Sequence, residues 1–237
     1  LYKKNILALR GSFRPVTKVN MDMLKKSYDI FVREPSVEEE NTIVIFEITL
    51  SNLKASGEID EQDFMDRAEL LCSLGHTVMI SKFQEYFKLV EYFSNYTKAK
   101  IGLTMGVNNL VDIFDEKYYR HLSGGILEAF GKLFFKDLKV YLYPMKNDDT
   151  GQIMTSNNVK VHPRMKELYK FFKYNGKVMD IIDYDPEILH VFSRDVLKKI
   201  INGEEGWEEV LPEGIAEMIK TKNLFTRKQI EEKPEAE

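Results

Sequence analysis

The residues best suited to chemistry lie in a short turn near the N-terminus. Residues 11–17 read GSFRPVT and separate an apolar, strand-like run from a stretch with helical apolar spacing. Gly11 lets a ligand approach the backbone closely, Ser12 offers a hydroxyl, and the free N–H groups of the following helix carry partial positive charge. Further cations are Arg10, Arg14 and Lys18. The combination indicates a phosphate-binding turn, with a plain tight turn flanked by surface charges as the alternative.

Two later segments have the same character. Gly106 ends an apolar, strand-like run and fits a turn at the carboxyl end of a strand. Ser193 lies just before a helical stretch around residues 195–201, with Arg194 and Lys198 close by. We expect these loops to meet the first turn at one edge of a sheet and to hold a negatively charged ligand together.

Strand-like and helical patterns alternate along the chain. Strands are predicted over residues 5–9, 42–50, 76–81, 100–105 and 140–143. Helices are predicted over residues 21–32, 60–74, 83–97, 126–135, 163–174, 195–201 and 212–220. The alternation predicts an α/β fold: a three-layer, Rossmann-like parallel sheet of about five or six strands, followed by C-terminal helices. Such sheets bind ligands at the carboxyl ends of their strands, where the connectivity reverses.

Composition excludes several classes of protein. The 237 residues, 43% of them hydrophobic, suffice for one large domain or two small ones. Lys and Arg number 34 against 38 Asp and Glu, so no global basic field points to nucleic acid. One cysteine, Cys72, excludes a disulfide framework and a cysteine-based metal site built within the chain. No apolar run approaches the roughly 18 residues of a membrane span, so we expect a cytoplasmic protein without membrane or nucleic-acid partners.

The candidate loops resemble one enzyme family. The segment GSFRPVT, residues 11–17, resembles G-[ST]-F-D-P-[IV]-H-x-G-H, the signature of nucleotidylyltransferases and especially of nicotinate mononucleotide adenylyltransferases. Residues 101–110, IGLTMGVNNL, resemble the family's F-I-I-G-A-D-x-L. Residues 191–203 resemble its I-S-S-T-x-I-R-x-x-[LI]-x-x-G, and residues 210–225 resemble its closing helix. The matches keep the family's order over nearly the whole chain.

The resemblance implies a nucleotidylyltransferase-like fold and adenylyl transfer from ATP to a mononucleotide, as in NAD biosynthesis by bacterial-type enzymes. The acceptor phosphate would attack the α-phosphorus of ATP and displace pyrophosphate, with Mg²⁺ accompanying ATP and no metal ligand assigned to the chain. The nucleotide or phosphorylated small molecule would lie between the first turn and the late helix. The nucleotide- and phosphate-binding residues expected there are Gly11, Ser12, Phe13, Arg14, Lys18, Gly106, Ser193, Arg194 and Lys198.

The sequence departs from the family pattern at its catalytic positions. Thr17 and Asn20 stand where the family has two histidines, and Arg14 stands where it has Asp. Leu197 replaces the late Arg and Asn108 replaces the Asp after the later strand. Because such phosphate contacts are worth orders of magnitude in rate, two hypotheses stay open. One is an adenylyltransferase in which nearby cations compensate, and the other is a catalytically inactive nucleotide- or phosphate-binding or scaffolding domain.

The domain organisation is also predicted. Residues 1–228 are expected to form one domain, and the absence of an initial Met suggests part of a longer protein, so a second domain of the same protein is a candidate partner. Residues 229–237 are charged, lack apolar anchors and are predicted to be a disordered tail.

Two further groups of polar residues have alternative interpretations. Glu47 and Ser81 follow strand-like runs in an order that weakly resembles haloacid-dehalogenase phosphatases, although those need an Asp nucleophile. Asp180, Asp183 and Asp185 would suggest a metal cluster, but their spacing favours turn and surface roles.

Overall fold

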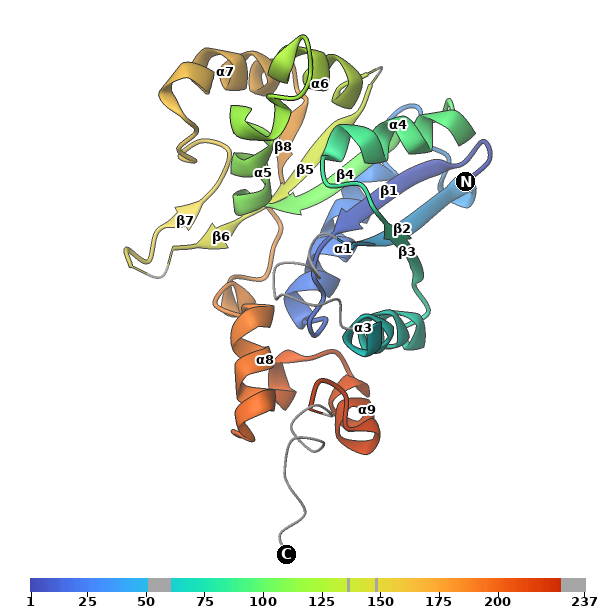
Figure 1. Ribbon diagram of the computed structural model, residues 1–237, viewed down its shortest axis with the longest axis vertical. Helices are drawn as coiled ribbons and strands as arrows, with labels where there is room; N and C mark the ends of the chain where they lie inside the picture. Colours follow the sequence, from blue (N-terminus) through green and yellow to red (C-terminus); the bar gives the residue numbers. More distant parts are fainter. Residues whose placement is uncertain (51–60, 136, 148, 227–237) are drawn as a thin grey trace, which may run out of the picture.

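Six apolar segments assemble into one parallel sheet. The computed structural model describes residues 1–50, 61–135, 137–147 and 149–226, and the predicted tail, residues 229–237, lies outside them. Within the described residues the strand order is β3-β2-β1-β4-β5-β8, and every neighbouring pair is parallel (Figure 1). The strands are β1 (Asn5–Arg10), β2 (Thr42–Thr49), β3 (Thr77–Ser81), β4 (Ile101–Gly106), β5 (Lys139–Tyr143) and β8 (Val178–Asp180). The order reverses between β1 and β4.

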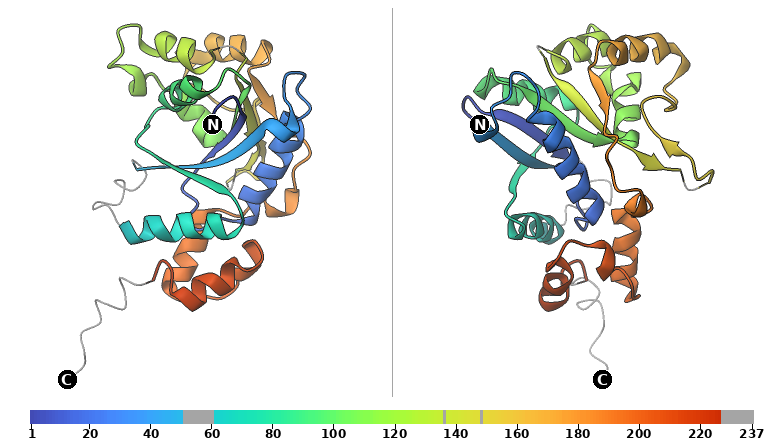
Figure 2. Two further views of the ribbon diagram at one scale, coloured as in Figure 1. Left: turned by 90° about the vertical axis from the view of Figure 1, so that its right-hand side faces the viewer. Right: turned by 180° about the vertical axis from the view of Figure 1, so that it is seen from behind.

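Helices cover both faces of this sheet and make the three layers expected from the sequence. The first core contains residues of α4 (Tyr86–Tyr96), α5 (Val107–Ile113), α6 (Gly125–Leu133) and α7 (Lys166–Tyr174). The second contains residues of α1 (Lys18–Phe31), α3 (Glu61–Ser73), α8 (Ser193–Asn202) and α9 (Ile215–Lys222). Figure 2 shows α8 and α9 lying beyond one edge of the sheet. The predicted three-layer α/β fold with C-terminal helices is therefore confirmed.

Side chains along β1 point alternately into the two cores. Ile6 and Ala8 face the first core, whereas Leu7 and Leu9 face the second. All four are at most 2% exposed, and full burial of a large aliphatic side chain contributes about 1.5–3 kcal/mol. Close approach of α1 to the sheet depends on Gly102, because a Cβ there would lie 3.0 Å from the ring of Phe31, the last residue of α1.

Some elements differ from the prediction. Strand β8 was not expected, because its three residues, VMD, are too short to show an alternating pattern. Helix α1 begins at Lys18, three residues before the predicted start, since Thr17 already serves as its N-cap. A small antiparallel pair, β6 (Met145–Lys146) and β7 (Ile153–Met154), was also not predicted.

The last described residues are fixed on α3. Lys222 pairs with Glu69, and the backbone N–H of Phe225 donates to Oδ2 of Asp66 at 3.1 Å. The last described residues therefore pack against α3, a helix from the first half of the sequence. Across the described part of the chain, no helix combines the length and apolarity needed to cross a bilayer.

The glycine inside α6 gives a test of the helix assignments. A Cβ at Gly131 would meet nothing within 4 Å, so Gly131→Ala should raise the free energy of unfolding by about 0.5–1 kcal/mol. Gly203 follows α8 with a φ of 68°, where a side chain is strained, so Gly203→Ala should lower the free energy by about 1 kcal/mol. Urea denaturation measures both, and two changes of the same sign would contradict the assignments.

Candidate functional site

The first turn folds back onto its own phenylalanine. A Cβ at Gly11 would lie 2.9 Å from the ring of Phe13, so this turn requires glycine. Phe13 adopts a φ of 47°, and its ring packs edge-on against Phe46 with centroids 5.1 Å apart. The Phe13 side chain is therefore part of the core, which corrects the expectation that it faces a phosphate. Gly11 and the exposed Ser12 remain at the surface of the turn.

Thr17 and Asn20, at the positions of the family's histidines, bind each other. The backbone N–H of Thr17 donates to Oδ1 of Asn20 at 2.9 Å, and the Thr17 hydroxyl donates to the same oxygen at 3.1 Å. The backbone N–H of Asn20 donates to the Thr17 carbonyl at 3.0 Å. Thr17 is 1% exposed. The pair closes the start of α1 in the manner of a capping box, so these polar groups are directed at the helix rather than at a ligand.

Arg14 is held by a buried carboxylate. Its Nε donates to Asp63 on α3, and Asp63 also accepts from Arg67 of the same helix. Nη1 of Arg67 lies 3.4 Å from the Ser12 carbonyl. Asp63 and Arg67 are both at least 95% buried, so the network fixes the first turn on α3. The positive charge of Arg14, which was expected to compensate at the phosphate site, is balanced within the protein.

Arg10 is the last residue of β1, and its side chain points to the face of the sheet opposite to that of Leu9. Its Nε donates to Oε2 of Glu47 at 2.5 Å, and Nη1 donates to the Gln84 carbonyl at 3.0 Å. The Ser81 hydroxyl donates to the other oxygen of Glu47. Glu47 is completely buried and bound on both oxygens, so it is not placed to act as the nucleophile of a phosphatase.

Three buried polar atoms near the reversal of strand order lack hydrogen-bond partners among the described residues. They are Nη2 of Arg10, the Tyr86 hydroxyl and the Thr104 hydroxyl. The Arg10 guanidinium lies 4.4 Å from the centre of the Tyr86 ring. Thr104 pairs in register with Leu9 of β1, so its side chain points to the other face of the sheet. Burial raises the pKa of Tyr86, so its hydroxyl keeps its proton. Unsatisfied groups of this kind are uncommon in proteins.

Gly106 and the start of α8 lie at the same edge of the sheet. Gly106 ends β4, and a Cβ there would meet nothing within 4 Å. Ser193 is the first residue of α8, while the side chains of Arg194 and Lys198 are 70% and 73% exposed. Each of these two cations lies 3.7 Å from Asp195, a weak surface pairing. They remain available to an anion from solution.

A strap between β8 and α8 brings this helix to the first turn. The Tyr143 hydroxyl donates to Oδ2 of Asp22 on α1 at 2.5 Å, and the backbone N–H of Asp185 donates to the same oxygen at 3.1 Å. Val191 and Val196 belong to the buried apolar cluster that contains Phe13 and Val16. Figure 1 shows α8 next to the end of α1 that follows the first turn. The start of α8 therefore lies on the same side of the molecule as the first turn.

The aspartates of residues 180–185 have structural partners. Asp180 accepts from the backbone N–H and hydroxyl of Ser156, and Asp183 pairs with Lys26 at 2.7 Å. Asp185 caps the short 3₁₀ turn that follows it. Within the described ranges, no group of three or more His, Cys, Asp or Glu side chains is placed to hold a metal ion.

The ion pairs of Arg10 and Arg14 were not predicted from the sequence. For Arg10 a signal existed, because Arg10 ends one buried strand-like run, Glu47 lies within the next, and parallel pairing of the two strands would join them. Arg14 and Asp63 gave no such signal, since their contact depends on how α3 packs against the first turn.

Comparison with known proteins identifies the fold. The structure resembles Plasmodium falciparum nicotinic acid mononucleotide adenylyltransferase complexed with NaAD, with a TM-score of 0.54 and 12% sequence identity over 94% of this chain and 97% of that one. The same enzyme complexed with APC gives a TM-score of 0.55 at 12% identity and the same coverage. No family model matches the sequence, and no curated protein matches it. The likeness thus confirms a nucleotidylyltransferase-like fold across nearly the whole chain.

The network around Asp63 predicts a large loss of stability when it is broken. Asp63→Asn removes the buried carboxylate that Arg14 and Arg67 share, so the free energy of unfolding should fall by about 3 kcal/mol. Asp183→Asn is the matched control, because it removes an exposed ion pair and should leave stability nearly unchanged. Urea denaturation compares the two variants. Equal effects would show that the network does not anchor the turn.

Proposed function

We propose that this chain binds a nucleotide through its phosphates at the carboxyl ends of β1 and β4, without efficient adenylyl transfer. The observation that carries the proposal is the pair of unsatisfied buried atoms, Nη2 of Arg10 and the Tyr86 hydroxyl, beside the reversal of strand order. A phosphate oxygen would supply the acceptor that Nη2 of Arg10 lacks, and guanidinium groups bind phosphate strongly. The likeness in fold to enzymes complexed with NaAD and APC supports a nucleotide as the ligand class.

Exposed groups on the other face would hold the rest of the phosphate chain. Ser12 and Lys18 flank the start of α1, and Arg194 and Lys198 flank the start of α8. The N–H groups of Lys18 and Val19 point out of the first turn of α1 and favour an anion. Mg²⁺ would arrive with ATP and be held mainly by its phosphates, as the described residues offer no cluster of metal ligands.

Transfer is not favoured because the groups at the histidine positions are engaged. Thr17 and Asn20 bind each other, and the Arg14 charge is balanced by Asp63. Neither arrangement leaves a group to neutralise charge that develops on the α-phosphate or on pyrophosphate. Adenylyl transfer to a mononucleotide is the second candidate, favoured by the exposed cations Lys18, Arg194 and Lys198.

Calorimetric titration with ATP and Mg²⁺ tests the binding. We expect a dissociation constant below the millimolar range, and we expect Lys18→Ala and Arg194→Ala each to weaken it by about 3- to 10-fold. Lys170→Ala, on the distant α7, is the matched control and should leave the affinity unchanged. Absence of binding at millimolar ATP would refute the proposal.

A pyrophosphate-release assay with ATP and nicotinate mononucleotide separates the two candidates. We expect no release above the protein-free rate. Sustained release that Arg194→Ala diminishes would instead establish transfer, with the cations replacing the histidines.

A further inference from the structure

Strand β3, residues Thr77–Ser81, lies at one edge of the six-stranded sheet (Figure 1). One of its sides pairs with β2, and no described strand pairs with the other. The backbone N–H of Leu50, just after β2, donates to the Ser81 carbonyl at 2.8 Å, so Ser81 turns its backbone groups towards β2. Because this direction alternates along a strand, Val78 and Ile80 turn their N–H and C=O groups outwards. These are the groups that an added strand would bind.

The β3 edge lacks the features that usually prevent such pairing. Residues 70–81 contain no Lys, Arg, Asp or Glu, although 30% of the chain is charged. The strand also has no proline, and Ile80 is 47% exposed. The opposite edge differs, because β8 has only three residues and its Asp180 is bound by the N–H and hydroxyl of Ser156. Proteins commonly protect edge strands with charges, proline or short length, so of the two edges β3 is the one open to pairing.

The sequence of β3 is complementary to itself in antiparallel pairing. With a two-fold axis at Met79, Thr77 of one copy lies opposite Ser81 of the other, and Val78 lies opposite Ile80. Since Val78 and Ile80 turn their backbone groups outwards, each such pair exchanges both of its N–H···O bonds. Pairs of β-branched side chains and pairs of hydroxyl side chains both stabilise sheets. No charge lies within the pairing, so nothing in the strand repels a second copy.

Side chains beside the strand would extend the contact on both faces. Val78 packs against the second core and Met79 against the first. Beyond the strand, Phe83 packs on Tyr92 of α4 with ring centroids 5.4 Å apart, and both side chains are only partly buried. A five-residue strand with few neighbours buries less than the roughly 1,000 Å² expected of a stable complex. A weak, reversible contact is therefore expected.

We propose that β3 pairs with β3 of a second copy of this chain, antiparallel about an axis at Met79, so that two sheets become one continuous sheet. The occupant is a strand because the edge offers a row of backbone donors and acceptors, which another strand satisfies. It is a second copy because the uncharged sequence of β3 complements itself. The assembly closes at two chains, since both use the same edge.

Sedimentation equilibrium of the whole chain, from low to high micromolar concentration, tests the dimer. We expect the mass to rise with concentration towards twice that of the monomer. Ile80→Lys places a charge opposite Val78 and close to the same lysine of the other copy, so it should weaken the dimer at least about 10-fold. Ile80→Thr keeps a β-branched side chain and should weaken it less than about 3-fold.

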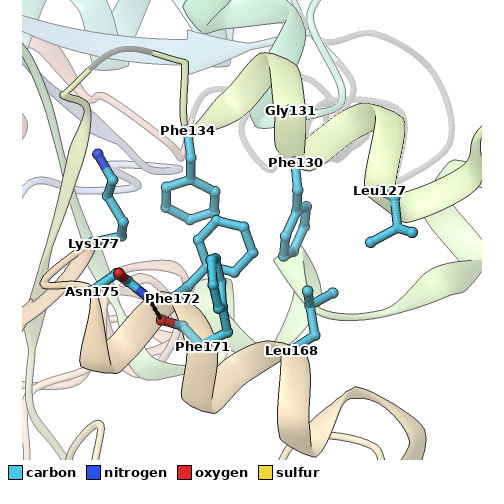
Figure 3. A pocket seen from close by; sticks show the side chains of 9 residues that line it. All are labelled: Leu127, Phe130, Gly131, Phe134, Leu168, Phe171, Phe172, Asn175 and Lys177. Carbon is cyan, nitrogen blue, oxygen red and sulfur yellow. Dashed lines mark hydrogen bonds between the residues drawn. The ribbon is translucent and has the colours of Figure 1, made fainter.

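The apolar groove between α6 and α7 provides the matched control. Phe171 lines this groove and is 59% exposed, close to the exposure of Ile80, and it lies on the β8 side of the sheet (Figures 1 and 3). Phe171→Lys therefore makes the same change of chemistry away from β3. It should leave the dimer unchanged.

Disulfide cross-linking tests the register. In a Cys72→Ser background, which removes the only cysteine, Met79→Cys places two thiols at the axis. Opposite residues of such a non-hydrogen-bonded pair have Cα atoms about 4.5 Å apart, within reach of a disulfide. We expect a covalent dimer on mild oxidation. Thr77→Cys is the control, because its two copies would lie four residues apart along the pairing, about 13 Å, and should not cross-link.

Three outcomes would overturn the proposal. They are a monomer at every concentration, a dimer that Phe171→Lys weakens and Ile80→Lys does not, and cross-linking of Thr77→Cys equal to that of Met79→Cys. The first would leave the edge to an extended segment of another protein. The second would assign the dimer to the groove between α6 and α7.

Discussion

The arrangement of the first turn depends on one buried carboxylate. Asp63 accepts from Arg14 of the turn and from Arg67 of its own helix, and the charges of Asp63 and Arg67 are buried where water screens them little. A buried charge without its partner is costly, so the three residues constrain one another. The position of the turn on α3 follows from this, and with it the burial of the Phe13 ring. The same pairing removes from the ligand side a cation that the sequence places in the middle of the turn.

The backbone fold and the side chains of the first turn point to different roles. The likeness at TM-scores of 0.54 and 0.55 shows that the chain shares its overall fold with an adenylyltransferase. The side chains on that backbone serve the protein itself: Thr17 and Asn20 complete the helix start, and Arg14 completes an ion pair. A fold permits a chemistry without requiring it, and the difference lies in a few polar atoms.

The sequence predicts the fold better than the site. Strands such as residues 42–49 and the helices between them are recognisable because burial imposes local periodicity, and their order then limits the topology to few choices. Strand β8 is not predicted, because a segment of three residues is too short to show a periodic hydrophobic pattern. At the site, the roles of Gly11, Ser12 and Ser193 stay predictions, since no ligand contact is described for them. The pairings of Arg10 and Arg14 escape because they join segments brought together only by tertiary packing.

Helix α3 contacts both the first turn and the last described residues, and so connects these two segments. Phe225 and Lys222 hold Asp66 and Glu69, while Asp63, on the adjacent turn of the same helix, holds Arg14. Because these contacts are all made by α3, loss of the contacts of either segment should weaken those of the other. Protease sensitivity near residue 226 would then report on events at residue 14, although neither position touches the other.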